Sequence, residues 1–416
     1  MKILQLPAYF YPESAASSHL SSNLREAYAE NGFDMELFCP VPTRGVTDDE
    51  RAIYKKLKYE ELLDGHLKVH RFNLMKEGKN PIGRALRYFL CNIKHYSCAV
   101  KCKDADIIAV SSTPPTQGVM AALVKKRLKV PFIYDLQDIF PDSLVNTGLT
   151  KKGSLIWKIG RKIENFTYKN ADKITVISED FKRNIMEKGV PEEKIEVVYN
   201  WVDENAVVSV EREKNPLFDK YELDRDKFYI CYSGNIGHTQ NMDMLCSVAK
   251  QLEDNSKIGF VIVGDGAYKQ KLVDIIEEKQ IKNITLIPFQ DYSDISYVFS
   301  LGDMGLIISK KGVGSNSVPS KTWSVMSASR PVLASFDKDS EINRIITENE
   351  CGVCVEADDE KALIDAIVIA SENTEVIKQM GLNGREFILN NLTREIGTNK
   401  KVNIIKQVVE NHNAKR

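Results

Sequence analysis

Short, continuous apolar runs alternate with helical patterns along almost the whole chain, and this alternation limits the possible folds more than any other feature. Typical runs are "PFIYDL" at residues 131–136 and "IGFVIV" at 258–263, each followed by a turn and a stretch of helical periodicity. Strands that are apolar on both faces are typical of a parallel sheet covered by helices on both sides. The alternation therefore predicts a doubly wound α/β architecture, in which ligands bind beyond the carboxyl ends of the strands.

A polar, charged segment without clean periodicity interrupts this alternation at residues 203–227. Because 416 residues exceed what one core normally holds, we expect two domains. The predicted organisation is a doubly wound domain at 1–205, a linker at 206–225 and a second doubly wound domain at 226–392. The amphipathic stretch at 393–416 is predicted to form a C-terminal helix that crosses back onto the first domain.

The composition is that of a globular protein, with 43% hydrophobic and 28% charged residues. Its eight cysteines lie in mostly apolar settings, so we expect reduced thiols, including the CxxC pair Cys351 and Cys354. No run of about 18 apolar residues is present, and the N-terminus resembles a first strand rather than a signal peptide. The expected location is cytoplasmic.

Positive charge is concentrated in residues 75–190, which hold 21 lysines and arginines against 11 aspartates and glutamates, while the whole chain has a net charge of −1. Two amphipathic helices predicted at 79–103 and 151–169 combine basic with aromatic and aliphatic residues. Such faces suit an anionic membrane surface, which suggests peripheral attachment to the inner face of the cell membrane. An ordinary solvated helix face is the alternative. No nucleic-acid-binding motif is present, so nucleic acid is not an expected partner.

Three loops after strands of the second predicted domain could hold an anion. "YSGNIGHTQNMD" at 232–243 has glycines that let a phosphate approach the backbone, and a helix that starts near Asn241 offers free N–H groups. "VGDG" at 263–266 is the second loop, and "SVPSKTWSVM" at 317–326 adds hydroxyls and an ammonium. A glycine-rich turn without ligand, a helix cap at the aspartate of "VGDG" and a solvated lysine are the structural alternatives. None of the loops is a Walker A motif.

Two loops of the first predicted domain could bind a second substrate. "YDLQDIFPDSLV" places Asp135, Asp138 and Asp142 just after a buried strand. These carboxylates could hold sugar hydroxyls or accept a proton, or they could cap the next helix. The first strand–helix loop, at 9–24, has small residues that permit close approach of a substrate but are also common at helix starts.

Several of these stretches, taken in order, resemble the family-four retaining glycosyltransferases. "ADKITVISEDFKRNIMEKGVPEEKIEVVYNWVD" is similar to the end of that family's first domain, and "SGNIGHTQN", "VGDG", "VPSK…RPVLAS" and "DSEI" are similar to its second. Each motif alone has little specificity, but the ordered set is specific and covers nearly the whole chain. "YFYPE" and "DIFPDSLV" are most similar to a bacterial branch that builds capsule, O-antigen or exopolysaccharide, including fucosamine-type transferases.

The resemblance implies the GT-B fold, with two facing Rossmann-like domains. It also implies retaining transfer of a hexosyl or N-acetylhexosaminyl group from a nucleotide-diphosphate donor, often UDP-linked, to a lipid-linked or glycan acceptor. No metal or other cofactor is implied, because helix N-termini and basic side chains neutralise the diphosphate. The implied catalytic residues are Asp138 and Lys321. The implied donor-binding residues are Gly234, Asn235, Gly237, His238, Gln240, Gly264, Asp265, Gly266, Asn316, Ser317, Ser320, Ser324 and Glu341. The implied acceptor-binding residues are Glu13, Ala15, Ala16, Ser17, His19 and Asp142.

The chain departs from the family pattern in the donor-binding loops. The family usually has Glu-x7-Glu where this chain has Asn316 and Ser324, and an Arg and a Lys where it has Asn235 and Gln240. Replacing a charged hydrogen bond by a neutral one predicts roughly 10- to 100-fold weaker donor binding. A carboxylate of "SFDKDSE" at 335–341 could compensate.

Two other functions remain open. A sugar-nucleotide 2-epimerase-like enzyme of the same architecture would consume a UDP-sugar without an acceptor, although the order of the motifs argues against it. A non-catalytic scaffold would bind no nucleotide but would still bind a membrane or a partner enzyme.

Overall fold

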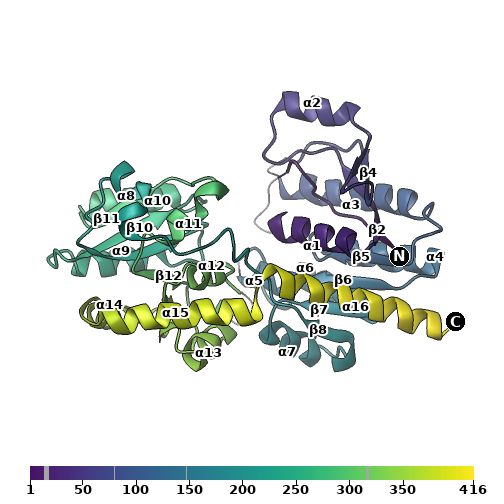
Figure 1. Cartoon of the computed structure of the whole chain (residues 1–416). Coiled ribbons are helices and arrows are strands. Elements are labelled where there is room, and N and C mark those ends of the chain that lie inside the picture. The colour runs from purple at the N-terminus through teal and green to yellow at the C-terminus, as the bar shows by residue number, and fades with distance from the viewer. Residues whose placement is uncertain (14–17, 79, 147, 315–317) are drawn as a thin grey trace. The chain divides into compact units, whose positions relative to one another are not determined.

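The computed structural model describes residues 1–13, 18–78, 80–146, 148–314 and 318–416. It divides the chain into two compact units (Figure 1). Unit 1 comprises Met1–Tyr199 together with Gly397–Arg416, and unit 2 comprises Asn200–Ile396.

The described part of unit 1 is built on an eight-stranded sheet with the strand order β3-β4-β2-β1-β5-β6-β7-β8. Its strands are β1 (Lys2–Gln5), β2 (Asp34–Pro40), β3 (Tyr59–Leu62), β4 (Leu67–Phe72), β5 (Ile107–Ser111), β6 (Phe132–Leu136), β7 (Lys173–Val176) and β8 (Ile195–Val197). Its helices are α1 (Ser18–Glu30), α2 (Asp48–Lys56), α3 (Pro81–Ala99), α4 (Gln117–Leu128), α5 (Asp142–Asn146), α6 (Leu155–Asn170), α7 (Glu179–Glu187), the short η1 (Glu192–Lys194) and most of α16 (Arg394–Ala414).

Neighbouring strands of this sheet are parallel except at one edge, where β3 and β4 pair antiparallel. The sequence analysis did not single out these two strands. The antiparallel pair is possible because a short turn at 63–66 joins them, whereas parallel neighbours need a crossover.

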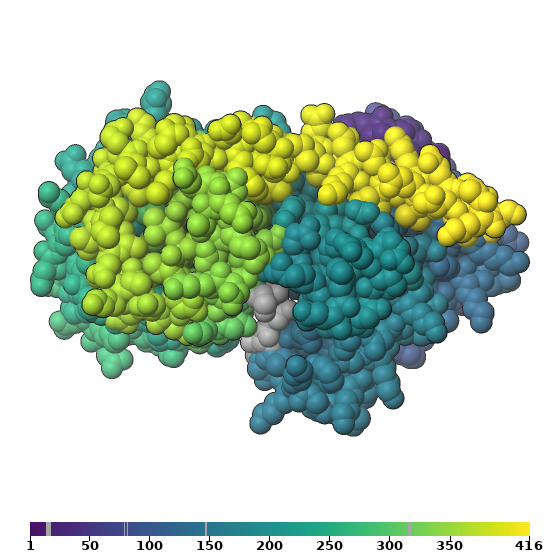
Figure 2. Space-filling model, turned by 90° about the horizontal axis from the view of Figure 1, so that it is seen from below, coloured from purple at the N-terminus to yellow at the C-terminus, as the bar shows by residue number. Residues whose placement is uncertain are grey.

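The core of unit 1 includes residues from both ends of the chain. Ile3, Leu37 and Val69 of the sheet pack with Tyr28 of α1 and Ile405 of α16 in one buried cluster. In the space-filling view, the yellow residues of α16 lie along the surface of unit 1 (Figure 2). The C-terminal helix is therefore part of the first domain's core, because burial of its apolar side chains stabilises both.

Unit 2 is built on a six-stranded sheet with the order β11-β10-β9-β12-β13-β14, and its neighbouring strands are all parallel within the described residues. Its strands are β9 (Phe228–Ser233), β10 (Ile258–Val263), β11 (Ile284–Ile287), β12 (Met304–Ile308), β13 (Val332–Ser335) and β14 (Gly352–Val355). Its helices are η2 (Arg212–Lys214), α8 (Pro216–Lys220), α9 (Met242–Gln251), α10 (Lys269–Glu278), η3 (Tyr292–Asp294), α11 (Ile295–Phe299), α12 (Lys321–Ser327), α13 (Glu341–Glu348), α14 (Glu360–Glu372) and α15 (Thr374–Asn391).

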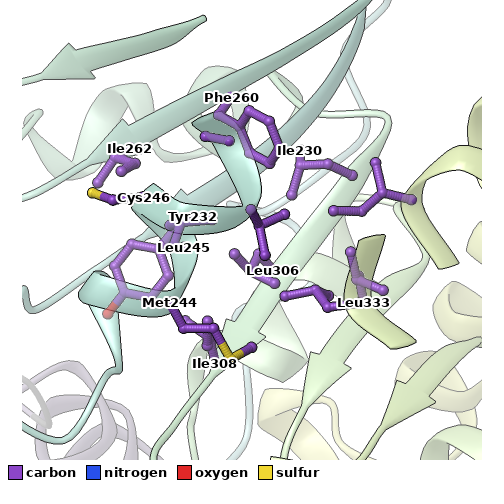
Figure 3. Close-up of a cluster of buried hydrophobic side chains, with 14 of the residues drawn as sticks. Ile230, Tyr232, Met244, Leu245, Cys246, Phe260, Ile262, Leu306, Ile308 and Leu333 are labelled. Carbon is purple, nitrogen blue, oxygen red and sulfur yellow. The ribbon is translucent and has the colours of Figure 1, made fainter. Parts of the chain in front are cut away.

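The central strands of unit 2 are apolar on both faces, as the continuous runs predict. All six residues of β10 are buried. Figure 3 shows Ile230 of β9 and Phe260 of β10 meeting Leu245 of α9 in one cluster. This packing fixes the strands, and with them the loops at their carboxyl ends.

The structure corrects the predicted linker at 206–225. This segment belongs to unit 2, where Leu217, Phe218 and Leu223 are buried against the sheet. Arg212 adds an ion pair to Asp303, with Nη2–O distances of 2.7 and 2.6 Å. The high polarity of the segment concealed the few apolar residues that anchor it.

The two basic helices predicted at 79–103 and 151–169 are α3 and α6. Among the helices of the described residues, none is both long and apolar enough to cross a membrane.

Candidate donor and acceptor sites

The turn after β9 brings a lysine of α12 close to a glycine. Gly234 has a φ of +135°, and a Cβ atom there would lie 3.2 Å from Nζ of Lys321. The same Nζ is 3.8 Å from the centroid of the Tyr232 ring, whose hydroxyl donates to the carbonyl of Asn235 at 2.6 Å. Lys321 therefore lies over the turn, where an ordinary side chain in place of the glycine would crowd it.

The charge of Lys321 has no compensating carboxylate among the residues that the structure describes. Burial lowers the pKa of Lys321 to about 7, because removal from water disfavours the charged form. An anion on this turn would stabilise the ammonium through charge-assisted hydrogen bonds. The position thus suits a phosphate group.

The loop after β10 supports the turn after β9. A Cβ atom on Gly264 would lie 2.0 Å from the carbonyl oxygen of Gly234, and one on Gly266 would lie 2.3 Å from that of Ile236. The backbone N–H of Ile236 donates to the carbonyl of Asp265 at 2.8 Å. The two glycines are needed because the two backbones touch, so they hold the turn after β9 in place.

Asp265 does not cap the following helix. Its Oδ1 accepts from the N–H of Gly266 at 2.8 Å, and the N-cap residue of α10 is Tyr268. The carboxylate is exposed at the outside of the loop.

Side chains of the first loop fold back on its own backbone. Oε1 of Gln240 accepts from the N–H of Gly237 at 3.1 Å and so braces the turn. His238 is exposed, and its ring meets that of Tyr268 edge-on at 5.3 Å. Asn241 precedes α9 without a side-chain cap, which leaves the N–H groups of the first turn available to a ligand.

The start of α12 supplies hydroxyls around Lys321. Ser320 occupies the N-cap position without a side-chain cap bond, and Ser324 lies half-buried one turn further on. The sequence analysis missed Thr322, whose buried hydroxyl has no hydrogen-bond partner among the residues that the structure describes. Its signal was the hydroxyl-rich run around "PSKTWS". Asn316 and Ser317 lie outside the described residues.

The two acidic residues of "SFDKDSE" that could replace the missing glutamates have different roles. Asp337 accepts from the N–H groups of Gly312 and Gly314 at 2.9 and 2.7 Å, so its carboxylate orders the loop that precedes residue 315. Glu341 is the buried first residue of α13. The two carboxylates therefore lie in different settings, one ordering a loop and one at the start of a helix.

Unit 1 has a pocket of about 860 Å³ beside the carboxyl ends of β1, β5 and β6, lined in addition by α1 and α16. Of the residues predicted for the acceptor site and its chemistry, the pocket brings together Glu13, His19 and Asp138. The small residues at 15–17 lie outside the described residues.

Glu13 lines this pocket, but other groups already engage its carboxylate. Oε1 accepts from the N–H groups of Thr43 and Arg44 at 2.7 and 2.9 Å, and Oε2 accepts from the N–H of Phe10 at 3.4 Å. Glu13 is therefore an anchor that ties the first loop to residues 43–44.

Asp135 forms a buried network that the sequence analysis did not foresee. Lys401 of α16 donates to its carboxylate and to Oγ1 of Thr175, the latter at 2.7 Å. Thr175 and Gln137 donate to the same carboxylate at 2.7 and 2.9 Å. Burial opposes ionisation of Asp135, but Lys401 and these hydrogen bonds outweigh it and lower the pKa. No local sequence signal connects Asp135 with Lys401.

Asp138 and Arg25 line the pocket, and neither forms an ion pair with another described residue. Asp138 is exposed overall, yet the surrounding protein desolvates its carboxyl group and raises its pKa. Nε of Arg25 donates to Gln5 at 2.9 Å, and burial lowers the pKa of Arg25 to about 10. The pocket thus offers the carboxylate of Asp138 for a hydroxyl group and the guanidinium of Arg25 for an anion.

Asp142 is not part of this pocket. Its Oδ2 accepts from Nζ of Lys188 at 2.7 Å, so its carboxylate forms an ion pair outside the pocket. In the described part of the chain, no three histidine, cysteine, aspartate or glutamate side chains gather as metal ligands.

Comparison with known protein families gives a separate match for each of the two parts of the chain. Residues 20–206 match the family model described as Glycosyltransferase Family 4, and residues 213–387 match the model described as Glycosyl transferases group 1. The chain belongs to the family-four glycosyltransferases. Among relatives, the probable glycosyltransferase WbjE of Pseudomonas aeruginosa is 27% identical over 68% of this chain and 70% of its own length. WcaI of Escherichia coli K12 is 26% identical over 58% of this chain and 61% of its own length.

Solved glycosyltransferase structures show the GT-B fold of this family-four chain. Alr3699/HepE of Anabaena, in complex with UDP, superposes with a TM-score of 0.74 at 15% identity, over 98% of this chain and 100% of its own. WaaG, a glycosyltransferase involved in lipopolysaccharide biosynthesis, gives a TM-score of 0.69 at 12% identity, over 97% of this chain and 99% of its own.

Proposed function

We propose that this glycosyltransferase moves a hexosyl or N-acetylhexosaminyl group from a UDP-sugar to a lipid-linked or glycan acceptor during synthesis of a bacterial surface polysaccharide. The observation that carries the proposal is the ammonium of Lys321 over the Gly234 turn, which no carboxylate of the described residues pairs and whose pKa burial lowers to about 7. The name of WcaI refers to colanic acid biosynthesis, and HepE was solved with UDP and with UDP-glucose. Similarity to the fucosamine-transferase branch is part of the same proposal.

Unit 2 would bind the donor. Lys321 and the free N–H groups of α9 would neutralise the diphosphate, and Ser324 would offer a neutral hydrogen bond to the ribose. Gly264 and Gly266 would act indirectly, by holding the turn that carries Gly234.

The acceptor would bind in the unit 1 pocket, with a hydroxyl at Asp138 and an anionic group near Arg25. The acceptor oxygen would attack the anomeric carbon on the face from which the diphosphate leaves, which retains the anomeric configuration. The bond from the anomeric carbon to the phosphate oxygen breaks as the new glycosidic bond forms, and the departing phosphate accepts the hydroxyl proton. Asp138 would hold and polarise that hydroxyl.

We further propose that the reaction requires no metal or other cofactor and takes place in the cytoplasm, with the protein attached peripherally to the inner face of the membrane. The positive charge that the leaving diphosphate needs would come from Lys321 and from backbone N–H groups.

The test is calorimetric titration of the purified chain with UDP, UDP-N-acetylglucosamine and GDP in EDTA, alongside Lys321→Ala. We expect a UDP-containing ligand to bind and the variant to bind about 10- to 100-fold more weakly. Absence of binding by all three ligands to the folded protein would contradict the proposal and favour a scaffold. Consumption of a UDP-sugar without any acceptor would instead indicate an epimerase.

A further inference from the structure

The outward face of α3 is apolar. Ile82, Leu86, Phe89, Ile93 and Tyr96 follow one another at the three- and four-residue spacings of a single helix stripe, and all are exposed, Ile82 by 80% and Phe89 by 62%. An exposed apolar stripe of this length is unusual on a globular protein and indicates a binding surface.

The inward face of α3 is polar where a buried apolar face would be expected. Arg87, Cys91 and His95 are buried there, and Nε2 of His95 contacts the carbonyl of Phe38 at 3.0 Å. Nη2 of Arg87 donates to Oγ1 of Thr43 at 3.2 Å. These contacts fix the rotation of the helix, so the apolar stripe cannot turn inward.

A second stripe lies on α6, where Leu155, Ile159 and Phe166 are exposed, Leu155 by 74%. Helix α4 packs between α3 and α6. Nδ2 of Asn92 on α3 donates to Thr116 before α4 at 2.8 Å, and a Cβ atom on Gly118 of α4 would lie 2.1 Å from Cγ2 of Thr167 on α6. The three helices therefore form one layer, and we call its outer surface the α3–α6 face.

The exposed charges of the α3–α6 face are all positive. Helices α3 and α4 contain no aspartate or glutamate, and the one acidic residue of α6, Glu164, is buried with Lys188 and Arg161. Lys158 and Lys162 are exposed beside the apolar stripe of α6. Apolar stripes flanked by lysines, without carboxylates, match the acyl region and the anionic headgroups of a membrane interface.

We propose that the α3–α6 face docks on an anionic phospholipid membrane, with the α3 and α6 stripes inserted at the headgroup–acyl boundary. The docking surface itself does not depend on the proposed function. Only what it implies for the acceptor rests on that function. Tyr88 of α3 shares a 2.8 Å hydrogen bond with Tyr9, and Tyr9 lines the 860 Å³ pocket. The helix that lies on the membrane therefore also supports the acceptor pocket, so the acceptor is lipid-linked rather than a soluble glycan.

The test is sedimentation of the full chain with mixed phosphatidylglycerol–phosphatidylcholine vesicles and with phosphatidylcholine vesicles. We expect binding that requires phosphatidylglycerol and weakens with salt. Phe89→Ser with Ile159→Ser should weaken it about tenfold or more, because insertion of each side chain removes apolar area from water. Lys158→Gln with Lys162→Gln should weaken it roughly 10- to 30-fold at low salt, about fivefold per charge.

The matched control is Ile369→Ser on α14 of unit 2, an equally exposed isoleucine that should leave vesicle binding unchanged. UDP titration of every variant separates loss of docking from loss of folding. Absence of wild-type binding to anionic vesicles, or equal binding by Phe89→Ser/Ile159→Ser, overturns the proposal. Light scattering could instead show a dimer that the same pair of substitutions dissociates. Such a dimer, together with a lack of vesicle binding, overturns the proposal in favour of a self-association surface. If vesicles bind as expected but no nucleotide binds, the docking surface stands and the proposed function fails.

Discussion

Lys321 and Tyr232 form a cation–π contact of 3.8 Å in which the cation has no carboxylate partner among the described residues. Burial lowers the pKa of Lys321 to about 7 from an ordinary 10.5. Between these two pH values the unfolded chain holds a proton that the folded chain lacks, so stability rises with pH in that window. Below about pH 7 the buried charge opposes folding in full. A bound anion would therefore compensate the charge of the Lys321 ammonium.

Binding of UDP should therefore take up a proton above neutral pH. At about pH 8 most Lys321 is neutral in the free protein, and a bound diphosphate would restore its charge. We expect affinity to fall as the pH rises above about 7, by up to tenfold per unit. Calorimetry in two buffers of different ionisation enthalpy measures the uptake. Lys321→Met should abolish it, and uptake that persists in this variant would assign the proton to another group.

Ser324→Glu should strengthen binding of UDP. A carboxylate at this position can form charge-assisted bonds to the ribose hydroxyls, where serine forms a neutral one, and we expect a gain of roughly 10- to 100-fold. Ser324→Gln is the matched control, since it has nearly the same shape without the charge. Equal affinity of the Glu and Gln variants would show that Ser324 does not face the ribose.

Gly264→Ala should disrupt the donor turn and destabilise unit 2. The new Cβ would lie 2.0 Å from the carbonyl oxygen of Gly234, a contact that backbone must move to relieve. We expect a loss of more than about 3 kcal/mol in urea unfolding, from overpacking added to an unfavourable φ. Gly32→Ala is the control, because its φ is +69° but nothing lies within 4 Å of its Cβ position. It should lose only about 1 kcal/mol, and equal losses for both would argue against the backbone contact.

Lys401→Met should destabilise unit 1 by about 3 kcal/mol at neutral pH, because it leaves the carboxylate of Asp135 buried without its cation. In the wild type, Lys401 helps to lower the pKa of Asp135, so the stabilisation is present above the unfolded pKa of about 4 and is lost as the pH falls through the folded one. Urea unfolding at neutral and acid pH measures both effects. Adding Asp135→Asn should restore most of the stability, whereas Lys400→Met, on the exposed side of α16, should change little.

The sequence was sufficient to predict the two α/β domains and the glycine-containing turns after β9 and β10. Runs such as the wholly buried β10 and glycine turns such as that at Gly234 are local signals, because strand burial and positive φ angles depend on neighbouring residues. Whether a side chain of the candidate sites is already engaged by another group could not be predicted from its neighbours in the sequence. Glu13, predicted to bind the acceptor, is engaged by the backbone of residues 43–44, and Asp142 is paired with Lys188.

By itself, then, the sequence determined the fold class, the family and the positions at which an anion could bind, since periodicity and short motifs encode these. Only the tertiary structure decided which charges are compensated. Asp135 and Lys401 are far apart in the chain but meet in unit 1, whereas Lys321 and Asp138 meet no opposite charge among the described residues. The same holds for α3, whose amphipathic pattern predicts two faces but not which one is buried. Contacts of Arg87 and His95 with distant segments turn its apolar face outward. Such pairings depend on crossovers between distant segments, which no local pattern specifies.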